Sequence, residues 1–276
     1  MVIGEYFLSL LLQLLFTVGA VALFGFAIYL ADRAFYRLAG GGRAVCYITG
    51  AIGTPIHEAS HALMCLVFGH RIEEIKLFAP DPETGTLGYV RHSYDRHNLW
   101  HRIGNFFIGV APVVIGSGVI LLLLVLLVPQ SREGVTGALS VITNASGVPA
   151  KAGAAFVAAG RLFVSVFSPA CFTNGLWYLF IVVALCISLH VDLSPADVKG
   201  SVSGAVVLVL ALAAVDAVLA VAGAVTGADP LGAVTSGIVT GGAVMSGVMA
   251  LSLALSLVLV VIAGVVRLIV SAASRT

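Results

Sequence analysis

Long apolar stretches separated by short polar segments dominate the chain. A helix needs about 20 apolar residues to cross a bilayer. The pattern therefore predicts an all-α membrane protein with about six transmembrane helices, in one polytopic domain covering residues 1–276. The predicted helices cover residues 6–30, 45–69, 103–128, 174–189, 201–222 and 240–268. The first apolar run is longer than that of a signal peptide, so we expect it to be retained.

Three polar or weakly apolar segments interrupt this pattern. Residues 70–102 hold ten of the 27 charged residues, 14 basic plus 13 acidic, and contain two β-prone runs at 72–78 and 86–92 around a turn-rich connection. They predict a small β-hairpin at the membrane surface, after the second helix. Residues 129–174 predict an interfacial segment. A polar break at residues 190–197 should end a helix before Pro195.

Composition agrees with a membrane location, since 60% of the residues are hydrophobic and only 10% are charged. The formal net charge is +1, and the basic residues form no dense block, so no nucleic-acid partner is expected. The partners to expect are the lipid bilayer and membrane proteins. Four cysteines lie without CxxC spacing, which favours buried small side chains over disulfides or a thiolate zinc site: Cys46, Cys65, Cys171 and Cys186.

The second predicted helix contains the sequence His57-Glu58-Ala59-Ser60-His61. Two histidines four residues apart lie on one face of a helix, where both rings can bind one zinc ion, and the glutamate between them can act on a water. The alternative is that the histidines form hydrogen bonds between membrane helices. That role does not need Glu58, so the motif predicts a metal-binding hydrolase.

Zinc bound by two histidines needs a third protein ligand and an open position. Val67 stands where a metzincin would have a third histidine, which excludes that class. The acidic residues of the predicted hairpin lie in β-prone sequence and do not suit a ligand on a following helix. The polar break supplies two candidates, Asp192 and Asp197, and either could instead be an ordinary helix cap.

The motif, the hairpin and the polar break resemble the site-2 protease family of intramembrane zinc metalloproteases. The resemblance covers residues 45–200, with residues 6–30, 201–222 and 240–268 as accessory helices. In that family an aspartate ligand stands near a proline and before a glycine, which implies Asp197, with Asp192 as the alternative. The chain lacks the family's PDZ module, and residues 129–174 occupy its place, which implies a divergent branch.

The third predicted helix departs from the family at Ala111-Pro112, where valines and an isoleucine follow in place of a substrate-holding asparagine. Asn105 and His190 are substitute substrate-binding candidates. The resemblance implies hydrolysis of peptide bonds in membrane-embedded or membrane-associated substrates. It assigns one Zn²⁺ ion to His57, His61 and Asp197, with Glu58 as the general base. The alternative is a metal-binding protein or ion transporter that uses the same groups.

The distribution of charge and histidine adds two expectations. Six spans place eight basic residues on the hairpin side and six on the other, so the hairpin side should be cytoplasmic. We expect a multi-pass protein of a bacterial cytoplasmic membrane, with the site open to the cytosol. Four further histidines surround the hairpin, and we expect them to be solvated at the interface and not to form a second metal site: His70, His92, His97 and His101.

Overall fold

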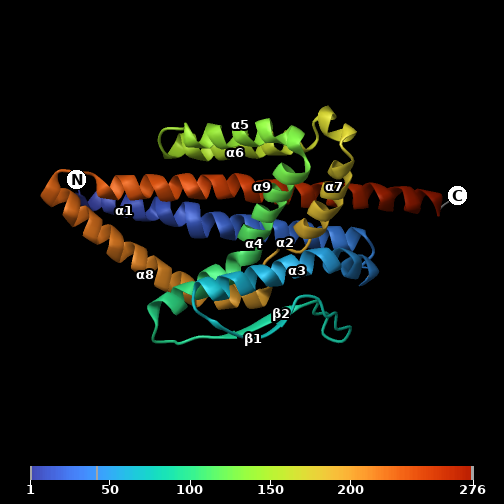
Figure 1. The fold of residues 1–276 in the computed structure, drawn as a ribbon, viewed down its shortest axis with the longest axis horizontal. Helices are drawn as coiled ribbons and strands as arrows, with labels where there is room; N and C mark the ends of the chain where they lie inside the picture. The colour runs from blue at the N-terminus through green and yellow to red at the C-terminus, as the bar shows by residue number, and fades with distance from the viewer. Residues whose placement is uncertain (1, 42, 275–276) are drawn as a thin grey trace.

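The structure is a computed structural model that describes residues 2–41 and 43–274. Helices make up most of this part of the chain, and two short strands form the remaining regular structure (Figure 1). The elements in order are α1 Val2–Leu14, the π-helical turn η1 Leu15–Gly19, α2 Ala20–Leu38, α3 Arg43–Val67, β1 Arg71–Lys76, β2 Tyr89–Ser93, α4 Leu99–Leu127, η2 Pro129–Ser131, α5 Arg132–Thr143, α6 Val148–Val166, η3 Pro169–Thr173, α7 Gly175–Ser188, α8 Pro195–Thr226 and α9 Pro230–Ala273. The prediction of an all-α protein with a small hairpin is confirmed.

Within the described residues, five helical segments are long and apolar enough to cross a membrane: Ile3–Leu38, Leu99–Leu127, Val148–Thr173, Pro195–Thr226 and Pro230–Ala273. The chain is therefore a membrane protein. Two of the six predicted spans do not meet these criteria. α3 carries the polar motif, which lowers its hydropathy, and α7 has only 14 residues.

The first apolar segment is longer than the predicted 6–30, because α1, η1 and α2 form one continuous helical segment to Leu38. Asp32, two residues beyond the predicted end, lies within α2, and its side chain is buried inside the protein. The chain turns only afterwards, where Gly40 and Gly41 adopt φ values of 82° and 67° that favour glycine.

The predicted interfacial segment 129–174 is instead a pair of packed helices. α5 and α6 lie side by side and pack along α9 (Figure 1). Lys151 on α6 is buried, and its ammonium donates hydrogen bonds to Ser236 and Thr240 on α9. These partners remove the need for the lysine to reach water, so one face of α6 packs against α9, while Phe156 on the other face is 87% exposed.

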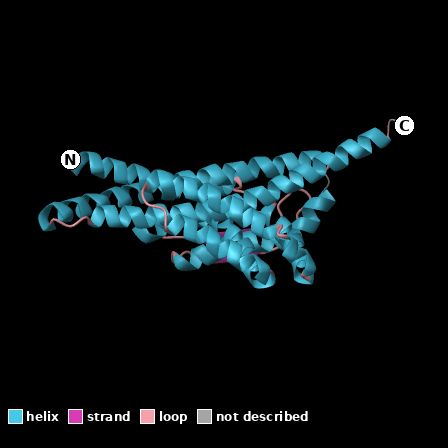
Figure 2. Ribbon diagram, turned by 90° about the horizontal axis from the view of Figure 1, so that it is seen from above, coloured by secondary structure: helices cyan, strands magenta, loops and turns pink. Residues whose placement is uncertain are grey.

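The hairpin lies on one face of the molecule, beside α3 (Figure 1). Seen from above, the helices largely hide the two strands (Figure 2). β1 and β2 pair antiparallel, with Ile75 opposite Val90 and an irregularity between Ile72 and Glu74. Backbone bonds from Ala79 and Asp81 to the 86–87 segment extend the pairing toward the turn. The predicted hairpin is confirmed.

Glycines permit the close helix contacts that bring the polar break to the motif. A Cβ atom on Gly53 of α3 would lie 2.5 Å from the carbonyl oxygen of Cys186 on α7. A Cβ atom on Gly109 of α4 would lie 2.6 Å from the carbonyl oxygen of Asp197 on α8. Larger residues at either position would push the ends of α7 and α8 away from α3 and α4.

Candidate metal centre

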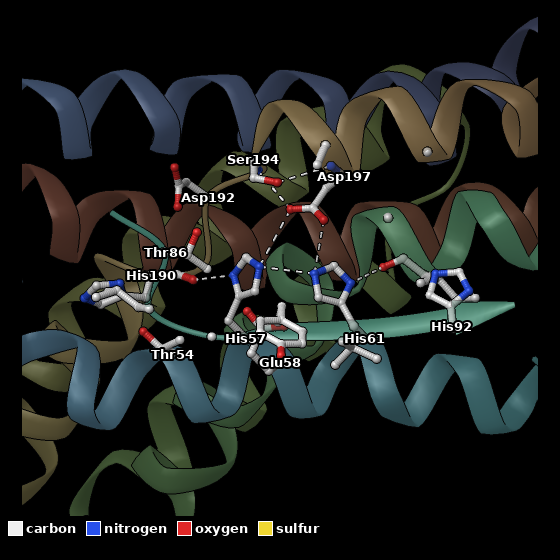
Figure 3. A pocket seen from close by; sticks show the side chains of 18 of the residues that line it. Thr54, His57, Glu58, His61, Thr86, His92, His190, Asp192, Ser194 and Asp197 are labelled. Atoms are coloured by element: carbon white, nitrogen blue, oxygen red, sulfur yellow. Dashed lines mark hydrogen bonds and ion pairs between the residues drawn. The ribbon is translucent and has the colours of Figure 1, made fainter. Parts of the chain in front are cut away.

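The two motif histidines of α3 face Asp197 at the start of α8 (Figure 3). The Nε2 atoms of His57 and His61 lie 3.1 Å apart. Asp197 places Oδ1 3.2 Å from Nε2 of His61 and Oδ2 3.7 Å from Nε2 of His57. The structure thus brings together three metal-ligating side chains whose ligand atoms lie within 4.8 Å of one another.

Hydrogen bonds at the other ring nitrogen fix the tautomer of both histidines. His57 Nδ1 donates to the carbonyl oxygen of His190 at 2.7 Å, and His61 Nδ1 donates to that of Ile108 at 2.8 Å. A carbonyl can only accept, so each Nδ1 carries a proton and each neutral ring has a lone pair at Nε2. With both rings neutral, the two Nε2 lone pairs lie 3.1 Å apart and can bind one cation between them. Ligating histidines in metalloproteins are held in the same way.

The Ile108 carbonyl, which accepts from His61, has no hydrogen bond within α4 because of Pro112. Within a helix, the carbonyl of residue 108 would accept from the amide of residue 112, but proline has no N–H. Ile108 therefore has an unused acceptor on the face of α4 that meets α3. The Ala111-Pro112 sequence thus has a local role in orienting a candidate ligand.

Asp197 belongs to a capping box as well as to the candidate site. Ser194 is the N-cap residue of α8 and accepts from the Asp197 amide at 3.2 Å, while Asp197 Oδ2 accepts from the Ser194 amide at 3.0 Å. The cap holds the carboxylate in one orientation. Asp197 can therefore cap α8 and serve as a metal ligand at the same time.

The donor set fits a zinc ion. Two donors bound tetrahedrally at 2.0–2.1 Å are about 3.3 Å apart, close to the 3.1 Å and 3.2 Å separations at His61. The longer His57–Asp197 separation of 3.7 Å needs a small movement. Two imidazoles and one carboxylate form a common donor set for catalytic zinc and leave one position open.

Asp192, the alternative ligand, is not part of this group of three. It lines the same cavity, but its carboxylate lies apart from the paired rings (Figure 3). Burial raises the pKa of Asp192, with the neighbouring Asp197 also raising it and His57 opposing the shift. The geometry therefore favours Asp197 as the third ligand.

A cavity of about 580 Å³ contains the three groups and Glu58. Glu58 is buried, with 7% of its surface exposed, and lies next to His57 (Figure 3). Gly88 passes so close that a Cβ atom there would lie 2.9 Å from Glu58 Cγ. The segment leading into β2 therefore forms a wall of the cavity directly beside the glutamate.

The substrate-binding candidates Asn105 and His190 both line the cavity. The His190 ring, however, lies 3.0 Å from the Thr49 hydroxyl, and burial, aided by His57, lowers its pKa to about 4. His190 thus acts on the site through its carbonyl. Sequence reasoning missed Thr54, whose buried hydroxyl lines the cavity without a hydrogen-bond partner among the described residues. Its spacing of four residues before Glu58 places it on the same helix face.

No family model, curated protein or solved structure matches the chain. The geometry of the centre therefore supplies the argument about function. Two imidazoles and a carboxylate can hold a divalent cation, and an adjacent buried glutamate can exchange protons with a water in the same cavity.

Proposed function

We propose that the chain is a zinc-dependent endopeptidase that cleaves membrane-embedded or membrane-associated proteins, as the resemblance to site-2 proteases implies. One observation carries the proposal: the Nε2 atoms of His57 and His61 and the carboxylate of Asp197 converge in a cavity that Glu58 also lines. A hydrogen-bonding role for the histidines alone would not require this carboxylate arrangement.

Each residue has one task in this proposal. His57, His61 and Asp197 hold one zinc ion, which when bound lowers the pKa of a water towards about 7 and polarises the substrate carbonyl. Glu58 accepts the proton from the attacking water and delivers it to the leaving amine. The carbonyls of His190 and Ile108 keep both imidazoles oriented.

The β2 strand supports binding of an extended substrate. β1 pairs with one edge of β2, while residues of the 85–90 segment and His92 line the cavity. A membrane helix must unwind before its carbonyls can react, and an added strand would satisfy its freed backbone groups. Val90→Pro should then impair cleavage without removing zinc. If cleavage of every substrate survives this change, substrate binding at β2 is wrong.

Glu58→Gln tests the proposed reaction. The amide cannot take the proton of water, so cleavage of a membrane-segment library in detergent should fall by about 10³-fold or more. Zinc content should stay at the wild-type value. Glu83→Gln, in the exposed turn of the hairpin, is the matched control and should remain active. Undiminished cleavage by Glu58→Gln would contradict the proposal.

A second candidate, ion transport, has support in a buried polar cluster. Gln13 on α1 donates to Asp216 on α8 at 3.0 Å and to Thr235 on α9 at 2.9 Å. Asp216 Oδ2 and Gln13 Oε1 are buried with no hydrogen-bond partner in the described part of the chain. Intramembrane acids often serve ion pathways. A transporter would show no cleavage in the wild type, and Glu58→Gln would alter metal flux.

We further propose a bacterial cytoplasmic membrane as the location, with the hairpin and the cavity on the cytosolic side. The excess of basic residues on the hairpin side, counted over the six spans predicted from the sequence, supports this orientation. A Thr84→Cys variant, in the exposed turn, should resist a membrane-impermeant maleimide in intact cells and react after lysis. Labelling of Thr84→Cys in intact cells would show that the hairpin faces the outside of the cell.

A further inference from the structure

A second group of metal-ligating side chains lies where the end of α3 meets the hairpin. Cys65, His70 and His92 place their ligand atoms within 4.8 Å of one another. We call these three residues the Cys-His-His cluster. Cys65 has no exposed surface and His70 has 4%, so the expectation that His70 is solvated was wrong. Three of the four cysteines are buried, as expected.

The turn after α3 brings Cys65 and His70 together. Gly69 has φ +72°, and the amides of Gly69 and His70 donate to the carbonyls of Leu66 and Cys65. These two bonds form a Schellman motif, in which the chain folds back over the last helical turn. His70 is consequently bonded through its backbone to Cys65.

The hairpin supplies the third member. β1 starts directly after His70, and Ile72 is opposite His92 in the pairing. His70 and His92 place their Nδ1 atoms 3.0 Å apart, and Tyr94 stacks on the His70 ring at 4.9 Å. The pairing of the hairpin thus fixes both imidazoles against the end of α3.

The hydrogen bonds of His70 leave its inner nitrogen free to bind a cation. His70 Nε2 donates to the His101 carbonyl at 2.8 Å, so in the neutral ring Nδ1 carries a lone pair directed at His92. A carbonyl acceptor on the outer nitrogen is typical of ligating histidines. Cys65 Sγ, fully buried, makes no hydrogen bond to any described residue.

We propose that Cys65, His70 and His92 form a second metal site, separate from the proposed catalytic centre, for a thiophilic divalent cation such as Zn²⁺. One thiolate and two imidazoles suit this class of ion, and three protein donors leave a position for water. Binding releases the Cys65 thiol proton, and His92 carries its proton on Nε2 in place of Nδ1.

The site would couple the end of α3 to the wall of the catalytic cavity. His92 also lines that cavity, and Gly88 of the same segment lies against Glu58. A metal ion that joins Cys65 to His92 would therefore hold β2 in position beside the glutamate. Its role in this arrangement is structural, because Cys65 and His70 do not line the cavity.

Cobalt substitution distinguishes the two centres because only the second has a thiolate. Protein produced with Co²⁺ and purified in detergent should contain about two ions per chain. Its spectrum should show a thiolate-to-cobalt charge-transfer band in the near ultraviolet. Cys65→Ala and His92→Ala should abolish the band and lower the content to about one ion. Cys171→Ala, which alters an equally buried thiol, should change neither quantity.

His57→Ala provides the reciprocal variant, since it removes a ligand of the first centre only. It should lose about one ion and keep the charge-transfer band. A band that disappears in Cys65→Ala but persists in His57→Ala supports the second site even if the first binds no metal. Absence of the band in wild type, or its persistence in Cys65→Ala, overturns the proposal. The remaining visible cobalt absorption of the first centre shows whether Cys65→Ala and His92→Ala are folded.

Discussion

His61 Nδ1 donates a hydrogen bond of 2.8 Å to the carbonyl oxygen of Ile108, which joins α3 to α4 at the proposed metal centre. The acceptor is free because Pro112 cannot donate to it. Pro112→Ala would restore an amide that competes with His61 for this carbonyl. We expect zinc affinity to fall by about 10- to 100-fold, as for other changes in the groups that orient metal ligands.

Competition between Zn²⁺ and a chelator of known affinity measures this effect in the purified protein. Pro149→Ala is the control, because Pro149 lies in the first turn of α6, where no helical hydrogen bond is missing. Equal zinc affinity in Pro112→Ala and wild type would show that the Ile108 carbonyl does not orient His61.

Gly53 should be required for the position of His57. Its substitution by alanine places a methyl group 2.5 Å from the Cys186 carbonyl oxygen and 2.6 Å from His190 Cδ2. The end of α7 must then move, which displaces the carbonyl that holds His57. We expect a loss of about 1–3 kcal/mol of stability and weaker zinc binding.

Gly118→Ala tests whether that loss is specific to close packing. A Cβ atom at Gly118 of α4 meets nothing within 4 Å, so this variant should bind zinc normally and unfold at the same temperature or higher. Thermal unfolding and zinc titration of both variants give the comparison. Normal zinc binding by Gly53→Ala would refute the packing argument.

His190 should make the protein less stable in mild acid. Burial, with a contribution from His57, lowers the pKa of His190 to about 4 in the folded protein, whereas the unfolded chain has a histidine pKa of about 6.5. The unfolded state therefore binds the proton first. The stabilisation is complete above about pH 6.5 and declines as the pH falls towards 4, with about 1 kcal/mol lost at pH 5.5.

His190→Gln removes this titration and keeps the backbone carbonyl that accepts from His57. The unfolding midpoint of wild type should fall more between pH 7.5 and about 5.5 than that of His190→Gln. His97→Gln, at an exposed position, should follow the wild type. If wild type and His190→Gln respond equally to acid, His190 does not titrate as described.

Gly88 should matter for cleavage and little for metal binding. A methyl group there would lie 2.7 Å from the Lys76 carbonyl oxygen and 2.9 Å from Glu58 Cγ, so the strand must shift from the glutamate. We expect Gly88→Ala to lower kcat/KM by about 10-fold or more while zinc content stays constant. Glu83→Ala, in the exposed turn of the hairpin and outside the cavity, is the control for side-chain change alone. Full activity of Gly88→Ala would show that cleavage does not depend on the position of this wall of the cavity.

The sequence was informative where chemistry depends on local spacing. The positions of His57, Glu58 and His61 follow from helical periodicity, and the break before Pro195 correctly located Asp197 near a helix start. The proximity of Cys65, His70 and His92 could not be predicted in this way. It depends on the left-handed turn at Gly69 and on strand pairing, which join residues without a common period. From the sequence, Lys151 indicated an interfacial helix. Its hydrogen-bond partners lie on α9, far away in the sequence, so its burial could not be foreseen.

Zinc content of Asp197→Ala, measured beside wild type and Asp192→Ala, tests the central claim most directly. Both substitutions remove a carboxylate that lines the same cavity, but only Asp197 belongs to the group with His57 and His61. We expect wild type and Asp192→Ala to retain the catalytic zinc through extensive washing and Asp197→Ala to lose it, together with all cleavage. Full occupancy in Asp197→Ala, or no zinc at His57 and His61 in wild type, would contradict the account.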